Sequence, residues 1–260
     1  MPPDVLIQEF LAEGVLGLKL NRPERRNALN RELRDRLVDA LAYAAREPSV
    51  KVLVLSASGP AFSAGADLAE LSAASDQDLQ QARAAYELIL VGLRQMPKPT
   101  LAALPGPAAG IGLSLALACD LRYASTQSRL IPGFVNLALM PDGGLTWILP
   151  RLVGSGRAYE LLYTGRELDA DEALGWGLVN RVLAPPDLDA EIAALAGRLS
   201  SGPQAVLGAI KRSILHASEV PWEEALDFEF LLQSVQLSGP EFKSSAQALA
   251  ARFVHPPASS

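Results

Sequence analysis

At 260 residues, of which 49% are hydrophobic and 20% charged, the chain is long enough to bury a sizeable core and has the composition of an ordinary soluble globular protein. Its 29 acidic and 23 basic side chains give a net charge of -6, and no run of lysine or arginine would attract a polyphosphate backbone. These features argue against nucleic acid as a partner.

The single cysteine and the amino-terminal residues bear on the cellular compartment. Cys119 lies in an apolar run, so no internal disulfide can form, and we expect a buried thiol in a reducing compartment. The chain opens Met-Pro-Pro-Asp, without the basic and apolar regions of a signal peptide, and no uninterrupted apolar stretch approaches the ~20 residues that span a bilayer. We therefore expect a cytoplasmic protein with no membrane partner.

The first elements predicted along the chain are a hairpin, a helix and a buried strand. Two apolar runs, Val5 to Phe10 and Val15 to Leu20, flank Gly14 and predict a β-hairpin. Asn30 can cap a helix whose leucines recur every four residues. The β-branched run Val50 to Leu55 is typical of a strand buried on both faces.

Helix and strand patterns keep alternating after this strand. The further helices are predicted over Asp76 to Met96, Gly110 to Ala118, Leu145 to Leu152 and Arg157 to Tyr163. Strands are predicted over Thr100 to Leu104 and Leu121 to Ala124. The alternation predicts an α/β domain over residues 1–195, with helices packed outside the sheets.

The pattern changes after Pro185-Pro186, because the remaining segments are helix-like with no strand between them. We therefore predict a separate helical region over residues 196–260. Its large apolar side chains, among them Trp222 and Phe230, either dock onto another subunit or pack within their own domain, and the sequence does not decide between the two.

Two segments rich in small residues carry the candidate chemistry. The first, Ser58-Gly-Pro-Ala-Phe-Ser-Ala-Gly-Ala-Asp67-Leu68, directly follows a predicted strand. Its glycines let a backbone approach a ligand closely and leave amide N–H groups unpaired, which an anion site needs. An ordinary strand-to-helix loop capped by Asp67 would have the same composition.

The second segment runs from Pro99 to Ser114, where a strand leads through a small-residue turn into an apolar helix. The first amides of that helix, near Ile111, have no intrahelical acceptor, and the helix dipole adds positive potential there. These amides could form half of an oxyanion hole. The segment matches neither common nucleotide-phosphate motif, which disfavours a phosphate-binding loop.

Together with Asn21 to Leu29 and Pro141 to Thr146, these segments resemble the crotonase (enoyl-CoA hydratase/isomerase) superfamily in order and approximate spacing, most nearly its 1,2-epoxyphenylacetyl-CoA isomerase type. The resemblance implies a spiral of ββα units with a C-terminal helical trimerisation region, in homotrimers or homohexamers. It also implies an acyl-CoA thioester substrate. Coenzyme A would enter as part of that substrate, with no separate cofactor and no metal.

The resemblance implies roles for individual residues. It places the two oxyanion-hole donors at the backbone N–H groups of Ala64 and Ile111. The residues expected to line the coenzyme A groove are Arg25, Arg26, Ala28, Gly65, Ala66, Asp67 and Leu68. Either arginine could meet the coenzyme A phosphates, although a solvated basic turn explains each arginine taken singly about as well.

The chain departs from the hydratases of the family, which use two glutamates. Ser114 occupies the first glutamate position and Phe134 the second, so both are expected to shape the substrate pocket and efficient hydration is not expected. Asp142 remains, and double-bond isomerases of the family carry an aspartate at the matching position. Pro-Asp-Gly is also ordinary turn chemistry, in which Asp142 would only cap the next helix.

The resulting hypothesis is an acyl-CoA isomerase that moves a double bond, or rearranges an epoxide, through a thioester enolate. Asp142 would move a proton between two carbons while Ala64 and Ile111 hold the enolate oxygen. A weakly active enoyl-CoA hydratase and a non-catalytic acyl-CoA-binding homologue remain alternatives. With His216 and His255 as the only histidines, both in the tail, a serine hydrolase or a zinc site is hard to build.

Overall fold

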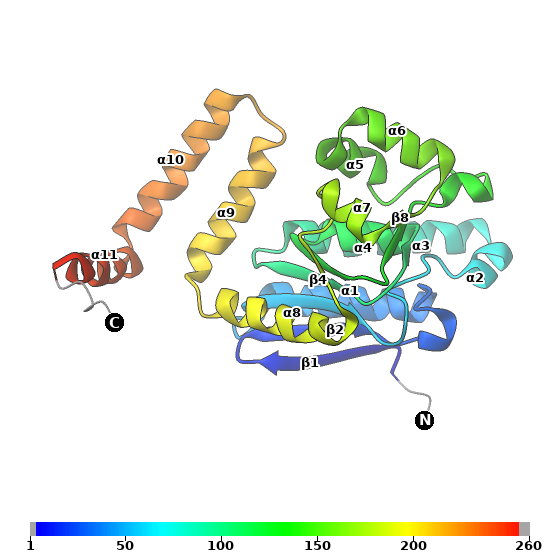
Figure 1. Cartoon of the computed structure of the whole chain (residues 1–260), viewed down its shortest axis with the longest axis horizontal. Coiled ribbons are helices and arrows are strands. Elements are labelled where there is room, and N and C mark those ends of the chain that lie inside the picture. Colours follow the sequence, from blue (N-terminus) through cyan, green and yellow to red (C-terminus); the bar gives the residue numbers. More distant parts are fainter. Residues whose placement is uncertain (1–3, 255–260) are drawn as a thin grey trace. The chain divides into compact units, whose positions relative to one another are not determined.

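The computed structural model describes residues 4–254, without the side chains of residues 248 and 250–254, so His255 lies outside the described part. The chain divides into two compact units, one ending at Ser200 and one beginning at Ser201 (Figure 1). The predicted boundary after residue 195 falls inside helix α8 (Pro185–Ser200), which packs on the sheet of the first unit.

The first unit contains a six-stranded sheet in the order β1-β2-β3-β4-β6-β9. Its strands are β1 (Leu6–Ala12), β2 (Val15–Leu20), β3 (Val52–Ala57), β4 (Thr100–Leu104), β6 (Leu121–Ser125) and β9 (Arg181–Leu183). The hairpin of β1 and β2 is antiparallel, and all other neighbours pair in parallel. Gly14 makes the hairpin turn with a φ of 75°, which confirms the predicted turn.

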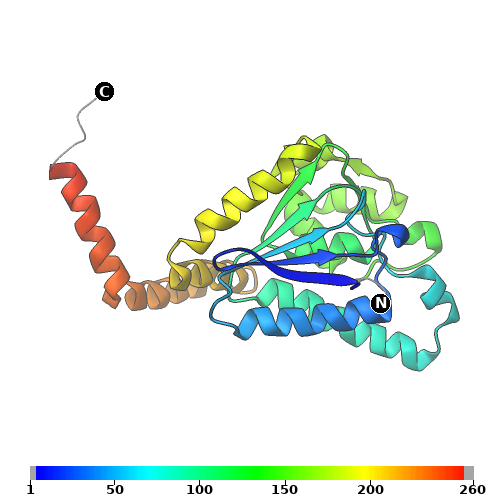
Figure 2. The same ribbon diagram turned by 90° about the horizontal axis from the view of Figure 1, so that it is seen from below.

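The side chains of β3 alternate between two hydrophobic cores. Leu53 and Leu55 belong to the core shared with α1 (Arg31–Arg46) and α3 (Asp76–Gln95). Val52 and Val54 instead pack in the core formed with α8. Figure 2 shows α8 (yellow) and α1 (blue) on opposite sides of the sheet. The predicted strand is therefore buried on both faces, and the α/β architecture is confirmed.

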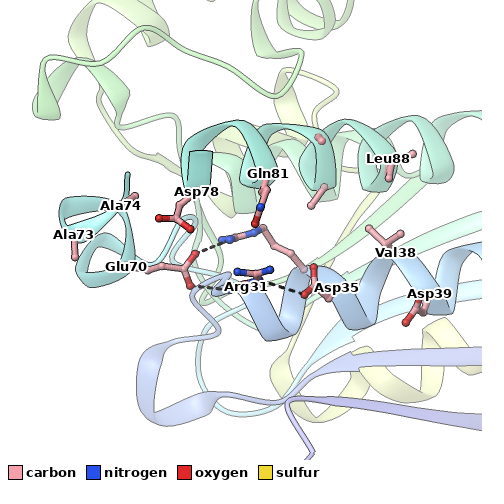
Figure 3. A pocket seen from close by; sticks show the side chains of 13 residues that line it. Arg31, Asp35, Val38, Asp39, Glu70, Ala73, Ala74, Asp78, Gln81 and Leu88 are labelled. Carbon is pink, nitrogen blue, oxygen red and sulfur yellow. Dashed lines mark hydrogen bonds and ion pairs between the residues drawn. The ribbon is translucent and has the colours of Figure 1, made fainter. Parts of the chain in front are cut away.

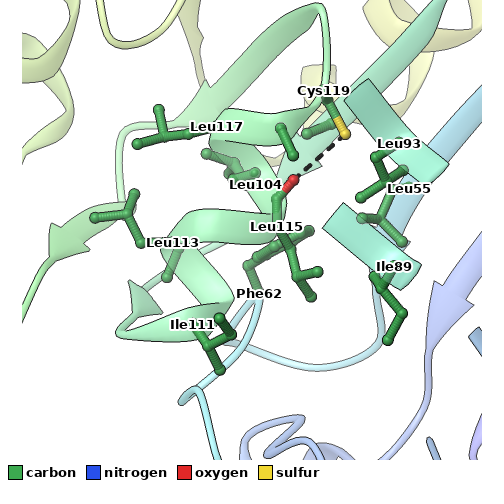
Figure 4. Close-up of a cluster of buried hydrophobic side chains, with 14 of the residues drawn as sticks. Leu55, Phe62, Ile89, Leu93, Leu104, Ile111, Leu113, Leu115, Leu117 and Cys119 are labelled. Atoms are coloured by element: carbon green, nitrogen blue, oxygen red, sulfur yellow. Dashed lines mark hydrogen bonds between the residues drawn. The ribbon is translucent and has the colours of Figure 1, made fainter. Parts of the chain in front are cut away.

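Helix α4 (Ile111–Ala118) is buried along its whole length, because its sequence IGLSLALA contains no charged residue. It lies in the centre of the larger core, where Leu115 and its neighbours pack with Phe62 (Figure 4). Cys119 follows the helix as a buried free thiol, whose Sγ lies 3.6 Å from the carbonyl oxygen of Leu115. The position of this helix fixes its first amide, that of Ile111, relative to the sheet.

A three-stranded sheet and several short helices complete the first unit. The sheet has the order β5-β7-β8, with β5 (Ala108–Ala109), β7 (Arg129–Ile131) and β8 (Leu168–Asp169). The helical elements are η1 (Pro23–Arg25), α2 (Leu68–Ala73), η2 (Phe134–Leu137), α5 (Leu145–Val153), α6 (Ser155–Thr164) and α7 (Ala170–Gly175).

The second unit consists of α9 (Gln204–Ala217), α10 (Trp222–Ser238) and α11 (Pro240–Val254), as the sequence predicted for the tail. The ring of His216 packs against Phe228 at a centroid distance of 4.3 Å, which is a helix-packing role. Trp222 and Phe230 are exposed in the chain taken alone. Their docking onto another subunit stays a prediction. No helix within residues 4–254 has both the length and the apolar character that crossing a membrane requires.

Candidate active site

The turn that carries the first small-residue motif is held between two backbone segments. Ser63 forms a parallel bridge with Ala108, and Ala66 forms another with Leu29. The buried Asn27 ties the start of the turn, because its side-chain amide donates to the carbonyl oxygens of Ser58 and Ala61 at 2.9 and 2.8 Å. The backbone of this loop is therefore fixed before any ligand binds.

The structure corrects one of the two predicted oxyanion donors. The N–H of Ala64 donates to the carbonyl oxygen of Arg26 at 2.8 Å, so it is already used within the fold. Arg26 has a left-handed backbone conformation with a φ of 49°. The next amide, that of Gly65, donates to the Ser63 hydroxyl at 3.1 Å. The amides of Ala64 and Gly65 are therefore both hydrogen-bonded within the fold and are not available to a ligand.

The amide of Ala66 takes the place that the sequence analysis gave to Ala64. Gly65 has a φ of 91°, and a Cβ on it would lie 2.7 Å from the Ala109 oxygen and 3.5 Å from the Ile111 nitrogen. Only a glycine allows this close approach, which brings the turn beside the first amide of α4. Among residues 4–254, neither the Ala66 nor the Ile111 amide donates a backbone hydrogen bond. These two amides are the pair available to bind an oxyanion.

The predicted coenzyme A groove has one partly buried ion pair and two exposed arginines. Asp67 does not cap α2 with its side chain but accepts from Arg22 at 3.0 Å. Burial works to raise the pKa of the Asp67 carboxyl, but the Arg22 hydrogen bond and backbone amides outweigh it and lower the pKa. Arg25 and Arg26 are exposed on the neighbouring loop, as is Leu68. Ala28 is buried beneath them.

A cavity of about 530 Å³ opens beside the first turn of α4. The residues that line it come from α3, α4, α5 and the loop before α5: Arg83, Tyr86, Glu87, Leu90, Val91, Arg94, Ile111, Ala118, Asp142, Gly143, Gly144, Trp147 and Ile148. This lining combines apolar and aromatic side chains with four charged groups, those of Arg83, Glu87, Arg94 and Asp142. The cavity thus brings Asp142 and Ile111, far apart in sequence, to one site.

Asp142 is not the cap of the following helix. The N-cap of α5 is Gly144, and no side-chain hydrogen bond caps this helix. Within the described residues, no lysine, arginine or histidine forms an ion pair with Asp142. Burial raises the pKa of the Asp142 carboxyl above its ordinary value. A carboxylate with a raised pKa and no cationic partner is suited to accept and return a proton.

The other two predicted pocket residues lie on either side of Ile111. A Cβ built on Gly110 would lie 3.8 Å from the ring of Phe134, so this ring covers the turn that precedes the Ile111 amide. Ser114 is fully buried one turn later on α4 and lies behind Gly143. Neither residue is a carboxylate, and their correspondence to the two hydratase glutamates stays a prediction.

The sequence analysis assigned no site role to individual residues of α3, which contributes several side chains to the cavity. Tyr86, Glu87 and Arg94 lie on one face of this helix and line the cavity with Trp147. The guanidinium of Arg94 stacks over the Trp147 ring at 4.2 Å. The spacing of these residues on α3 was visible in the sequence, but nothing in it indicated which helix face would meet the site.

A second cavity, of about 690 Å³, lies on the other face of α3, against α1 and α2 (Figure 3). Arg34 forms an ion pair with Glu70 at 2.5 Å on its wall, and the Arg34 guanidinium lies 5.3 Å from the centre of the Tyr86 ring. Tyr86 itself lines the first cavity, together with Asp142. Burial raises the pKa of the Tyr86 phenol, which favours its neutral form.

Comparison with known proteins decides the family. A family model described as enoyl-CoA hydratase/isomerase matches residues 11–253. The chain belongs to this family. Its relatives include the 1,2-epoxyphenylacetyl-CoA isomerase of Escherichia coli (strain K12), 33% identical over 95% of each chain. They also include 4-chlorobenzoyl coenzyme A dehalogenase-2 of an Arthrobacter species, 33% identical over 88% of this chain and 85% of the relative.

Among solved structures, the enoyl-CoA hydratase from Bacillus anthracis superposes with a TM-score of 0.92 at 30% identity, over 95% of this chain and 96% of the other. The crotonase-like fold and the superfamily predicted from the motifs are thereby confirmed. These relatives carry out different reactions on coenzyme A thioesters. The chain is accordingly a crotonase-type acyl-CoA enzyme, and the choice of reaction depends on its own site residues.

Proposed function

We propose that this enoyl-CoA hydratase/isomerase family member is an isomerase, which moves a double bond or rearranges an epoxide through a thioester enolate. The observation that carries the proposal is the Asp142 carboxylate, which lines one cavity with Ile111 and has no ion-pair partner among the described residues. The two glutamates of the hydratases are replaced by Ser114 and Phe134. An isomerase needs only one carboxylate, because the same group takes the proton from one carbon and returns it to another.

The enolate is stabilised by the two unpaired amides. Removal of a proton next to the thioester moves negative charge onto the carbonyl oxygen, and the N–H groups of Ala66 and Ile111 donate to that oxygen. Preorganised donors of this kind supply about 3 to 4 kcal/mol each when single donors are deleted in other enzymes. Phe134 and Tyr86 exclude water from the reacting carbons, so the enolate is reprotonated by Asp142.

Coenzyme A is bound as part of the substrate, without a separate cofactor. Its phosphates meet Arg25 or Arg26, which are exposed beside the Ala66 turn. Arg22 and Asp67 keep this turn in place beneath the thioester. The helices of the second unit assemble the enzyme as a homotrimer or homohexamer, through apolar side chains such as Trp222 and Phe230.

The proposal is tested by the variant Asp142→Asn, assayed on a panel of aliphatic enoyl-CoA substrates and the ring epoxide of phenylacetyl-CoA. Loss of the proton shuttle is expected to lower kcat by about 10²- to 10⁴-fold with little change in KM. Glu87→Gln is the matched control, because Glu87 also lines the cavity but belongs to α3 and not to the turn that packs against Ile111. This variant should keep at least about half of the parent activity.

Proton exchange distinguishes the proposed isomerase from the alternatives. The parent enzyme should exchange α or γ hydrogens of a bound acyl-CoA with deuterium from solvent, and Asp142→Asn should not. Full isomerase activity in Asp142→Asn would disprove the role of this carboxylate. Binding without exchange would identify a non-catalytic homologue, and addition of water to crotonyl-CoA that depends on Glu87 would identify a hydratase instead.

A further inference from the structure

The hydroxyl of Ser114 is an unusual group in this fold. It is the single buried side-chain polar atom among the described residues for which no hydrogen-bond partner is present. Ser114 is fully buried on α4, one turn after Ile111. Buried hydroxyls are nearly always hydrogen-bonded, since leaving one unpaired costs stability. An alanine at this position would avoid the cost. The hydroxyl therefore does not serve the stability of the ligand-free enzyme, which points to a role when substrate is bound.

The position of this hydroxyl places it next to the proposed proton shuttle. A Cβ built on Gly143 would lie 2.5 Å from Ser114 Oγ and 2.4 Å from Ile111 Cδ1. Gly143 directly follows Asp142, and both residues line the cavity with Ile111. The unpaired hydroxyl therefore lies beside the Ile111 side chain, against the turn that carries the carboxylate.

We propose that Ser114 is a positioning residue that donates a hydrogen bond to the Asp142 carboxylate when an acyl-CoA fills the cavity. The substrate then removes the water that solvates Asp142, and the hydroxyl replaces one of the lost hydrogen bonds. Serine keeps its own proton throughout, while Asp142 accepts a proton from one carbon and releases it to the other. This inference rests on the proposed role of Asp142 as the proton shuttle.

The donated bond has a defined effect on the acidity of Asp142. A hydrogen bond to the ionised form favours that form, whereas burial of the carboxylate disfavours it. The other titratable groups that line the cavity around Asp142 come from α3: Arg83, Tyr86, Glu87 and Arg94. Helix α4 has no ionisable side chain, and on α5 Arg151 stacks 3.8 Å from the Trp147 ring. All of these groups are unchanged in a Ser114 variant.

The test is Ser114→Ala in the full-length enzyme, with kcat measured against pH at saturating substrate. Asp142 must be ionised to take the first proton, so kcat falls on the acid side with the pKa of Asp142 in the complex. Without the donor, the midpoint of this acid limb should rise by about 1 pH unit, with KM changed less than about twofold. The melting temperature should not fall, because the variant removes an unsatisfied buried group.

Ser128→Ala is the matched control. Ser128 is equally buried, but its hydroxyl donates to the Leu104 carbonyl oxygen at 2.8 Å, away from the cavity. This variant should lower the melting temperature by about 2 to 4 °C and leave the pH profile unchanged. Comparison of the two variants therefore distinguishes a hydroxyl that acts on Asp142 from one that only stabilises the fold.

An unchanged acid limb in Ser114→Ala, or a loss of melting temperature equal to that of Ser128→Ala, would overturn the positioning role. If Asp142→Asn is inactive while Ser114→Ala keeps the parent pH profile, the inference fails and the proposed function stands. If Asp142→Asn is fully active, both the proposed function and this inference are wrong.

Discussion

Two loops build the site, and they are held in place by different means. The turn from Ser58 to Asp67 is held in three ways. Asn27 donates to its first residues, the Gly65 amide donates to the Ser63 hydroxyl, and Arg22 forms an ion pair with Asp67. The turn that carries Asp142 has, among the described residues, no side-chain hydrogen bond, and Gly143 fits against Ile111 and Ser114 by shape alone.

This difference follows from what each loop has to do. Amides that stabilise developing charge must point at a fixed place before the reaction begins, so their loop needs a rigid network. A carboxylate that moves a proton must not be held in an ion pair, so the loop that carries it needs another means of support. Packing of Gly143 against α4 supports this loop without an ion pair at Asp142.

Removal of the network of the first loop should have the largest effect. Asn27 is fully buried, donates two hydrogen bonds and accepts a third from the Arg22 amide at 2.8 Å. Asn27→Ala leaves these backbone groups buried and unpaired, which should lower the free energy of unfolding by about 3 to 5 kcal/mol. Denaturant unfolding followed by circular dichroism measures this loss.

The control for this variant is Asn136→Ala. The Asn136 side chain is exposed and makes one long hydrogen bond, to the Gly165 oxygen at 3.3 Å. Its loss should cost less than about 1 kcal/mol. Equal destabilisation by the two asparagine variants would show that the first loop does not depend on its hydrogen-bond network.

A single added methyl group should displace the second loop. In Gly143→Ala the new Cβ meets Ile111 and Ser114 within 2.5 Å at a residue with a φ of 61°. The loop has to move away from α4, and a shift of about 1 Å in Asp142 should lower kcat by about 10²-fold. Gly144→Ala carries comparable backbone strain, with a φ of 81°, but its Cβ has no atom nearer than 3.8 Å.

These two glycine variants are assayed for isomerase activity under one set of conditions. The comparison separates the effect of backbone strain from the effect of moving the loop away from α4. Gly144→Ala should lose stability with an activity per folded molecule within about threefold of the parent. An equal loss of kcat in both variants would mean that the backbone conformation of the loop, and not its contact with α4, determines where Asp142 lies.

Sequence reasoning was most successful where local pattern determines structure. The hairpin at Gly14, the helix capped by Asn30 and the uncharged helix from Ile111 all follow from short-range periodicity and capping. The carboxylate Asp142 was found because a turn before a helix was the one place near the aligned glutamate positions that still had an acid.

It failed where a choice depended on tertiary hydrogen bonds. The motif Phe62 to Asp67 offers several amides, and Ala64 is excluded only because the left-handed Arg26 directs its carbonyl oxygen at it. Tyr86 was not singled out for a similar reason, since the face of α3 that meets the cavity is set by packing and not by its composition. In both cases the sequence offered several similar groups, the amides of one turn or the faces of one helix, and only the tertiary structure decides which of them reaches the site.

The ion pair of the first loop should have the smallest effect, and it should depend on pH. Arg22 and Asp67 are 13% and 17% exposed, and the pKa of the Asp67 carboxyl is lowered from 3.8. A carboxyl with a depressed folded-state pKa stabilises the fold above its ordinary pKa, and this stabilisation is lost as the pH falls through the folded value. Asp67→Asn should therefore cost about 1 kcal/mol at pH 7 and progressively less below about pH 4.

The measurement is the free energy of unfolding of the parent and Asp67→Asn between about pH 2.5 and 7. Asp35→Asn is the control, because Asp35 is 63% exposed in its pair with Arg31 at 3.8 Å, and such pairs contribute little. The two stability curves of parent and Asp67→Asn should converge at the acid end. A difference that stays constant down to pH 2.5 would mean that the Asp67 side chain supports the loop through its shape and not through its charge.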